Sequence, residues 1–324
     1  MKAIFITKYG GPEVLQVQEV PTPTPKENEV LIKIHAAAIN NTDPLFRKGE
    51  PLISRLFTGL LKPKQSIPGD VLAGEIIEIG KSVTKFKIGE HVFGYSTDTF
   101  GAHAEYKCLP EDSAIINIPE NINYEEAAGI VDGGHTALVF LRDQGRISNN
   151  RKILIYGASG SVGTAAIQIA LSYGAEVTGV CSTQNLEMVK SLGAKRVIDY
   201  TKNDFTQENE KYDIIFDTVA KKSLSQCKNA LSENGIYLTT FPTPAVLIKG
   251  LFQSKIKGRR ALFVAAGMKP VVEKIENLKN LSNLIISNQL ITIIDREYSM
   301  NDIAEAHRYV ETGHKKGNVI IKIC

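Results

Sequence analysis

The chain of 324 residues has the composition of an ordinary folded protein, with 43% hydrophobic and 23% charged residues. Its net charge of +3 is too small to indicate a nucleic-acid partner, which usually requires a concentrated basic face. No apolar stretch approaches the ~20 residues that span a bilayer, and Met1 to Thr7 lacks a secretory core, so we expect a cytoplasmic protein without a membrane partner. Four scattered cysteines suit a reducing compartment and exclude a cysteine-framed zinc site.

The first third of the chain has the pattern of β structure. Short alternating or β-branched runs, separated by glycine and proline, lie at Glu29–His35, Val71–Ile79, His91–Tyr95 and Ala104–Leu109. Their spacing predicts a small barrel or sandwich.

One segment within this third, Pro51–Pro63, has apolar residues at helical spacing instead: Leu52, Ile53, Leu56, Phe57, Leu60 and Leu61. We interpret it as a lid over a substrate cleft, with a membrane-surface contact or a dimer contact as the alternatives.

After Pro119 the pattern changes to alternating helices and strands. Asn123 and Glu126 form a capping-box-like start to a helix that reaches toward Leu141. The predicted strands are Lys152–Tyr156, Glu176–Cys181, Arg196–Asp199, Tyr212–Asp217, Gly235–Thr240 and Ala261–Ala265, and the predicted helices between the first three are Val162–Tyr173 and Leu186–Leu192. This alternation predicts an α/β fold with a doubly wound parallel sheet.

The tail differs from the middle. It contains a long helical pattern at Pro270–Ile286, a strand at Ile291–Asp295, a second helix near Met300–Glu311 and a last strand at Asn318–Ile323. A β-rich start, a nucleotide-binding middle and a returning tail predict two domains, of which the first is discontinuous.

A glycine-rich turn, Gly157–Gly163, is the main functional motif. Ala158 replaces the first glycine of the dinucleotide fingerprint, while Gly160 and Gly163 keep the second and third positions. A buried-type strand precedes the turn and a helix follows it. Gly160 therefore lets the backbone approach a pyrophosphate, and the helix N-terminus presents N–H groups to it. The alternative is a tight turn that binds nothing.

The end of the second strand, Val180–Gln184, decides which nicotinamide cofactor is expected. An NAD site usually has an acidic residue here that holds the ribose 2′-hydroxyl. This chain has none, so we predict NADPH; the alternative is NAD bound through neutral contacts.

The chain as a whole resembles the medium-chain dehydrogenase/reductase superfamily, and within it the zinc-free branch of quinone oxidoreductases and NADPH-dependent reductases. The matching motifs are Tyr9–Leu15, Val30–Ala37, Gly74–Gly80, Phe86–Gly94, Gly101–Tyr106, Thr136–Ala137, the Gly157 turn, Leu192–Ala194, Val197–Tyr200, Ala304–His307 and Gly313–Asn318. The resemblance implies a Rossmann-type NADPH-binding domain over 124–267 and a discontinuous β-rich GroES-like catalytic domain over 1–123 and 268–324.

The resemblance also implies roles for individual residues. Phosphate contacts are implied for Ser159, Ser161 and Val162, which join Gly160 and Gly163 of the fingerprint as cofactor-binding residues. The resemblance also implies a 2′-phosphate pocket for Ser182 and Tyr200, and positions near the nicotinamide for Thr136 and Asn318. Relatives often dimerise through the last strand of the nucleotide domain, so the resemblance is compatible with a homodimer that uses residues 259–266.

The departures from the superfamily concern zinc. Zinc-dependent members have a cysteine at the position of Asn40 and His-Glu at the positions of Asp70 and Val71, so we expect no metal site. We expect Asn40 and Thr42 to bind the substrate carbonyl, with local backbone capping as the alternative. Many quinone reductases have a tyrosine at the position of Leu45, so a tyrosine proton donor is absent there. His135 is a candidate donor instead, with a packing or surface role as the favoured alternative.

Without a Lewis acid, an acceptor that is already activated is the easier substrate. We therefore predict an NADPH-dependent reductase of quinones or α,β-unsaturated carbonyls. The alternatives are a reductase of simple aldehydes or ketones, and a non-catalytic NADPH-binding redox sensor.

Overall fold

The structure is a computed structural model that describes residues 1–324 except 53–54, 97–99 and 242–257. The chain divides into two compact units. Unit 1 comprises Met1–Val131, Pro270–Ile286 and Thr292–Cys324, and unit 2 comprises Asp132–Lys269 and Ser287–Ile291. The expected domain boundaries at 123/124 and 267/268 stay predictions; the compact units change over at 131/132, inside helix α3 (Tyr124–Leu138), and at 269/270.

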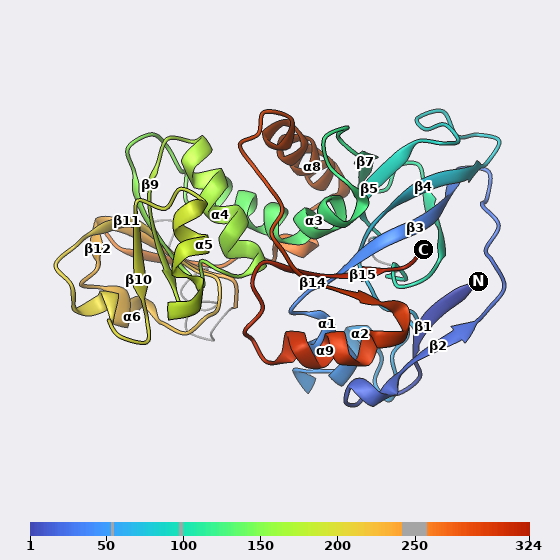
Figure 1. Ribbon diagram of the computed structural model, residues 1–324, viewed down its shortest axis with the longest axis horizontal. Coiled ribbons are helices and arrows are strands. Elements are labelled where there is room, and N and C mark those ends of the chain that lie inside the picture. Colours follow the sequence, from blue (N-terminus) through green and yellow to red (C-terminus); the bar gives the residue numbers. More distant parts are fainter. Residues whose placement is uncertain (53–54, 97–99, 242–257) are drawn as a thin grey trace. The chain divides into compact units, whose positions relative to one another are not determined.

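Unit 1 is built on a seven-stranded sheet with the order β14-β15-β3-β4-β5-β7, in which β6 also pairs with β3 (Figure 1). The strands are β3 (Glu29–Ile39), β4 (Val71–Ile79), β5 (His91–Tyr95), β6 (Tyr106–Pro110), β7 (Ile115–Asn117), β14 (Ile294–Ser299) and β15 (Asn318–Lys322), with a separate antiparallel pair β1 (Lys2–Ile6) and β2 (Leu15–Glu19). Alternate residues of β3, such as Ile32 and Ile34, pack with Leu72 and Ile76 of β4 in the core. The predicted β-rich region is confirmed.

The helices of unit 1 include two short ones near the N-terminus and two from the returning tail. They are α1 (Asp43–Lys48), α2 (Arg55–Thr58), α8 (Val271–Ile286) and α9 (Ile303–Glu311). None of the described helices is long and apolar enough to cross a bilayer.

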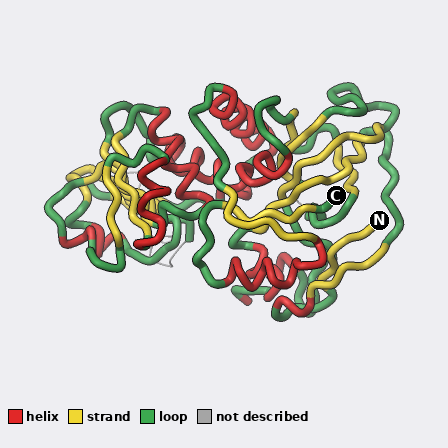
Figure 2. The backbone as a smooth tube through the Cα atoms, viewed as in Figure 1, coloured by secondary structure: helices red, strands yellow, loops and turns green. Residues whose placement is uncertain are grey.

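Unit 2 is built on a six-stranded sheet whose described strands all run parallel, in the order β10-β9-β8-β11-β12-β13. Figure 2 shows strands of this unit in yellow and helices in red. The strands are β8 (Lys152–Tyr156), β9 (Glu176–Cys181), β10 (Arg196–Asp199), β11 (Tyr212–Asp217), β12 (Leu231–Thr239) and β13 (Arg260–Leu262), with helices α4 (Ser161–Ser172), α5 (Leu186–Ser191) and α6 (Leu224–Cys227). The nearly continuous apolar runs of these strands are typical of a parallel sheet that is buried on both faces. The order is that of the doubly wound Rossmann sheet, which confirms the prediction.

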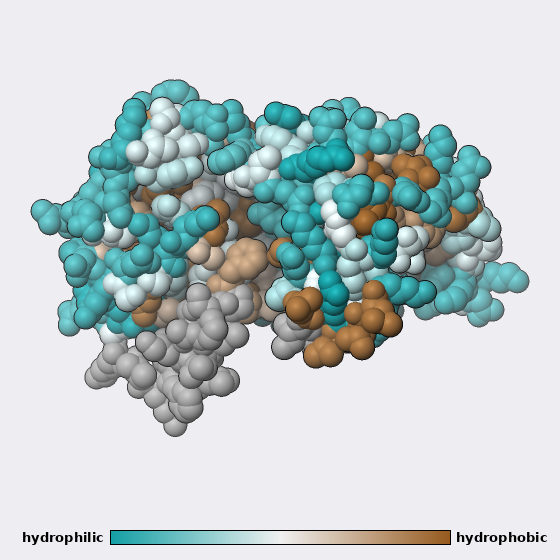
Figure 3. Space-filling view, turned by 90° about the horizontal axis from the view of Figure 1, so that it is seen from below, coloured by the Kyte–Doolittle hydropathy of each residue, from teal (hydrophilic) through white to brown (hydrophobic). Residues whose placement is uncertain are grey.

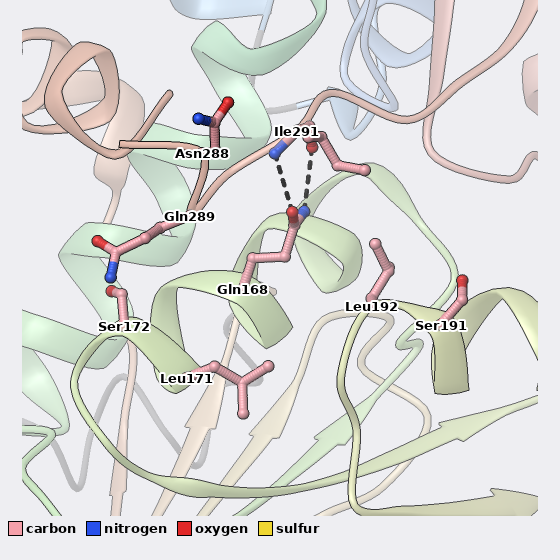
Figure 4. A pocket seen from close by; sticks show the side chains of 8 residues that line it. All are labelled: Gln168, Leu171, Ser172, Ser191, Leu192, Asn288, Gln289 and Ile291. Carbon is pink, nitrogen blue, oxygen red and sulfur yellow. Dashed lines mark hydrogen bonds between the residues drawn. The ribbon is translucent and has the colours of Figure 1, made fainter. Parts of the chain in front are cut away.

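The strand predicted at Ile291–Asp295 begins later in the structure, where β14 starts at Ile294. The side chain of Gln168 on α4 binds both backbone groups of Ile291. The Ile291 N–H donates to Gln168 Oε1 at 2.9 Å, and Gln168 Nε2 donates to the Ile291 carbonyl at 3.0 Å (Figure 4). With both groups bonded, Ile291 cannot join the sheet of unit 1. Beside these two hydrogen bonds lies a surface hollow of about 320 Å³, lined by Gln168, Leu171, Ser172, Ser191, Leu192, Asn288, Gln289 and Ile291.

The segment interpreted as a lid is an apolar surface of unit 1. Leu52, Leu56, Leu60 and Leu61 are exposed, Leu61 to 88%. Ile53 and the Phe57 side chain lie outside the described residues. Figure 3 shows brown, apolar atoms gathered on the face seen from below.

Candidate functional site

The glycine-rich turn connects β8 to α4 in unit 2. Gly157 has a φ of +82°, which side-chain-bearing residues rarely adopt. A Cβ atom at Gly163 would lie 2.2 Å from the Gly157 carbonyl oxygen, so only glycine permits this packing of helix against turn, whereas a Cβ at Gly160 would meet only that oxygen, at 3.6 Å. Gly160 is the N-cap of α4 and adds no side-chain cap. The first turn of α4 thus offers backbone N–H groups next to an uncovered glycine, which suits a pyrophosphate.

Helix α3 closes on the same turn. A Cβ atom at Gly133 would lie 2.4 Å from the Ser161 hydroxyl oxygen, so the helix backbone touches the start of α4. Thr136 is three residues further along α3 and therefore lies on the same helix face. Its side chain is half-buried. The structure thus brings Gly133 of α3 against Ser161, and the role of Thr136 near the nicotinamide stays a prediction.

The strand ends next to the turn hold the predicted adenosine residues. Tyr156 pairs with Val180 and Cys181 pairs with Asp199 in parallel register, so Ser182 and Tyr200 follow neighbouring strands at one edge of the sheet. The Tyr200 ring is 47% exposed. The hollow beside Gln168 is a different place, because it lies along the C-terminal half of α4.

Two residues at this edge were not predicted from the sequence. Asn185 is buried and donates hydrogen bonds from Nδ2 to the Ser159 and Ser182 hydroxyl oxygens, at 3.0 and 3.2 Å. Its position three residues after Ser182, at the N-cap of α5, is the only signal that the sequence contains.

Asp199 is the other; it ends β10, whereas the cofactor prediction depends on the end of β9. Its Oδ2 accepts from the Thr183 hydroxyl at 2.5 Å, and its Oδ1 accepts from the backbone N–H and the hydroxyl of Thr201 at 3.0 and 2.7 Å. These bonds, led by the one from Thr183, lower the pKa of Asp199. Both oxygens of this carboxylate are therefore already engaged by the protein.

In unit 1, Asn40 and Asp70 meet at one edge of the sheet. Asn40 follows the last residue of β3, Asp70 precedes β4, and the antiparallel register of Ala37 with Leu72 brings the two positions together. Asn40 is buried, and its Nδ2 donates to Asp70 Oδ1 at 3.1 Å. Burial raises the pKa of the Asp70 carboxyl, against the opposing effects of the Asn40 bond and the Lys274 charge. The second Nδ2 hydrogen of Asn40 makes no hydrogen bond within the described residues.

Thr42 is exposed and is the N-cap of α1, yet its hydroxyl makes no capping hydrogen bond. The Asp43 carboxylate binds the Asn40 backbone N–H instead, at 2.6 Å. The local-capping interpretation therefore fails for the side chains of both Asn40 and Thr42.

The remaining candidates are buried. The His135 ring is fully buried and lies 2.9 Å from the Ala266 carbonyl oxygen, which is a packing position. Asn318, in unit 1, donates from its backbone N–H and from Nδ2 to the Ile293 carbonyl, at 2.8 and 3.0 Å.

Comparisons with known proteins agree with this fold. The alcohol dehydrogenase GroES-like domain matches residues 26–120, and a family described as zinc-binding dehydrogenase matches residues 192–321. A chloroplastic quinone-oxidoreductase homolog of Spinacia oleracea is 32% identical over 99% of this chain and 98% of its own. A chloroplastic NADPH-dependent alkenal/one oxidoreductase of Arabidopsis thaliana is 31% identical over 99% of this chain and 79% of its own. The structure of the quinone oxidoreductase from Coxiella burnetii is 31% identical, with a TM-score of 0.87 over 100% of this chain and 99% of that one.

A Rossmann sheet with a dinucleotide turn, joined to a GroES-like domain, defines a nicotinamide-dependent dehydrogenase or reductase. The chain belongs to the medium-chain dehydrogenase/reductase superfamily and is a quinone oxidoreductase-like oxidoreductase.

The name of the second matching family raises the question of zinc. The residues do not fit a catalytic zinc, which needs three protein ligands. Asn40 is an amide bonded to Asp70, Val71 is a buried strand residue, and no group of three or more His, Cys, Asp or Glu that could hold a metal occurs among the described residues.

Proposed function

We propose that the protein is a zinc-independent, NADPH-dependent reductase that transfers hydride to a quinone or an α,β-unsaturated carbonyl. The observation that carries this proposal is the Asn40–Asp70 pair, an amide donor held by a carboxylate where a metal would otherwise polarise the substrate. The relatives' named activities, on quinones and on alkenals or alkenones, support the substrate class.

Reduced nicotinamide supplies the hydride when it is bound. The chain's own contribution is electrostatic. Because one Nδ2 hydrogen of Asn40 is bonded to Asp70, the amide is held in one orientation and its second hydrogen can bind the substrate oxygen. The exposed Thr42 hydroxyl is a second donor to the same oxygen. Two neutral donors suffice for an acceptor that spreads the incoming charge over a conjugated system, whereas a simple ketone gains more from a Lewis acid.

The cofactor phosphates would be held by unit 2. The first turn of α4 and the hydroxyls of Ser159 and Ser161 would bind the pyrophosphate, with Gly160 leaving the room for it. Ser182 and Tyr200 would bind the 2′-phosphate, and Thr136 and Asn318 would contact the nicotinamide half.

The test has two parts. Fluorescence titration gives the Kd of NADPH and of NADH, and NADPH oxidation is then followed with a panel of quinones, enones and simple aldehydes, before and after exhaustive dialysis against a chelator. We expect tighter NADPH binding, turnover of quinones or enones, and no effect of the chelator. Tighter NADH binding, turnover of aldehydes alone, no turnover at all, or activity restored by Zn²⁺ after dialysis would each contradict a part of the proposal.

A further inference from the structure

Asn185 joins two segments that the proposed cofactor site uses. Its Nδ2 lies 3.0 Å from Ser159 Oγ, in the glycine-rich turn, and 3.2 Å from Ser182 Oγ, after β9. Its side chain is only 4% exposed. One amide therefore bridges the pyrophosphate end and the 2′-phosphate end of the site.

The backbone fixes the position of this amide. Ser182 is the N-cap of a short 3-10 turn, Thr183–Asn185, and the Asn185 N–H donates to the Ser182 carbonyl at 2.9 Å. Asn185 is itself the N-cap of α5, although its side chain makes no capping bond there. Its Oδ1 is buried without a hydrogen-bond partner among the described residues. Leaving a buried acceptor unpaired costs folding free energy, so a contribution to stability does not explain the amide at this position. Its hydrogen bonds to the two serine hydroxyls explain it better.

The direction of the two hydrogen bonds determines what the serines can do. A hydroxyl has one donor hydrogen and two acceptor lone pairs. Because each Oγ accepts from Asn185, the hydrogen of each hydroxyl is left to donate outward, and neither donates to another described residue. Ser159 and Ser182 are both half-buried, so a ligand can reach them. Phosphate oxygens only accept, and two donors oriented in this way match them.

We infer that Asn185 is a positioning residue for cofactor selectivity: it orients the Ser182 hydroxyl as a donor to the 2′-phosphate of NADPH, and the Ser159 hydroxyl as a donor to the pyrophosphate. This inference rests on the proposed function, in which NADPH is the cofactor. This arrangement would provide uncharged donors to a 2′-phosphate at an edge that also carries the Asp199 carboxylate.

The main variant is Asn185→Asp, which keeps the shape but reverses the polarity. The carboxylate would accept the hydrogens of both hydroxyls and add a negative charge beside the phosphate. We expect the Kd for NADPH to rise roughly 100-fold, the loss of two charge-assisted hydrogen bonds, and the Kd for NADH, which has no 2′-phosphate, to rise only about tenfold, the loss of one. Asn234→Asp is the matched control, because Asn234 is exposed in the same unit and carries the same charge change; it should leave both Kd values unchanged.

A double-mutant cycle keeps the inference testable if Asn185→Asp fails to fold. Asn185→Ala should weaken NADPH binding about tenfold in the wild type and have no further effect once Ser159 and Ser182 are both alanine. A merely structural role would change the melting temperature and both cofactors equally in either background. At saturating NADPH, kcat should stay near the wild-type value.

The outcomes separate the two claims. If the wild type prefers NADPH but Asn185→Asp and Asn185→Ala change both Kd values by the same factor, the inference on Asn185 is overturned and the proposed function stands. If the wild type prefers NADH, both are overturned.

Discussion

Two glycines of the cofactor turn, Gly160 and Gly163, should respond differently to replacement by alanine. Gly160 has a φ of −81° and a ψ of 176°, which alanine adopts freely, and its added Cβ would meet only the Gly157 oxygen at 3.6 Å. The Cβ of Gly163→Ala would lie 2.2 Å from the same oxygen and 2.8 Å from the Ala158 backbone. The first substitution therefore fits the fold and the second does not.

These contacts set the expected magnitudes. Gly160→Ala should cost no more than about 1 kcal/mol of stability, because alanine is a poorer N-cap than glycine but meets no steric conflict here. Its methyl group would keep the pyrophosphate from the backbone, and the loss of one charged hydrogen bond, about 1.5–3 kcal/mol, corresponds to roughly a 10- to 100-fold higher Kd. Gly163→Ala should cost about 1–3 kcal/mol of stability, because helix α4 must move away from β8.

Thermal unfolding and fluorescence titration with NADPH measure the two effects separately. We expect Gly160→Ala to melt close to the wild type and to bind NADPH weakly, whereas Gly163→Ala should melt at a clearly lower temperature. Wild-type affinity in a folded Gly160→Ala protein would refute the placement of the pyrophosphate on this turn. A loss of stability in Gly160→Ala as large as that in Gly163→Ala would refute the steric reasoning.

Three further predictions concern other parts of the molecule. Asn40→Ala should lower kcat roughly 100-fold without changing the Kd for NADPH, because it removes an oxyanion donor and not a cofactor contact; equal losses in both quantities would contradict that role. We further propose a homodimer through β13, the edge strand of the unit 2 sheet, so Leu262→Glu should yield a monomer by sedimentation velocity; a monomeric wild type would disprove it. Desolvation of the fully buried His103 lowers its pKa from 6.5 to about 4. On acidification this histidine is therefore protonated first in the unfolded state. Stability should therefore fall by about 2 kcal/mol between pH 7 and pH 5, and urea titrations of His103→Gln should show a smaller fall; an equal fall would reject this cause.

The parts of the fold that follow from local pattern could be predicted from the sequence. The β-branched run Val71–Ile79 coincides with β4, because alternation and a closing glycine mark a strand without reference to its neighbours. The strand–turn–helix around Gly160 was also predictable, since its glycines have steric causes that stay within a few residues.

Features that depend on contacts between distant residues could not be predicted. The late start of β14 follows from Gln168, which is 123 positions away from Ile291. In the sequence Asn185 is an ordinary residue at the start of a helix, and only the structure shows its hydrogen bonds to Ser159 and Ser182. Asp199 is visible in the sequence as a carboxylate, but only the structure shows that Thr183 and its neighbours already satisfy it.

The Asn40–Asp70 pair leads to a prediction for the pH dependence of turnover. An ionised carboxylate only accepts hydrogen bonds, so Asp70 forces the Asn40 amide to present nitrogen to it and keeps the second N–H for the substrate. Burial raises the pKa of Asp70, although the nearby Lys274 charge opposes this. As the pH falls through that raised pKa, the protonated carboxyl also becomes a donor and no longer fixes the amide. The kcat should then fall on the acid side, at a pH above the ordinary range of an aspartate. In Asp70→Asn this acid limb should be absent, and kcat should be lower and flat; if the limb persists, another group is responsible for it.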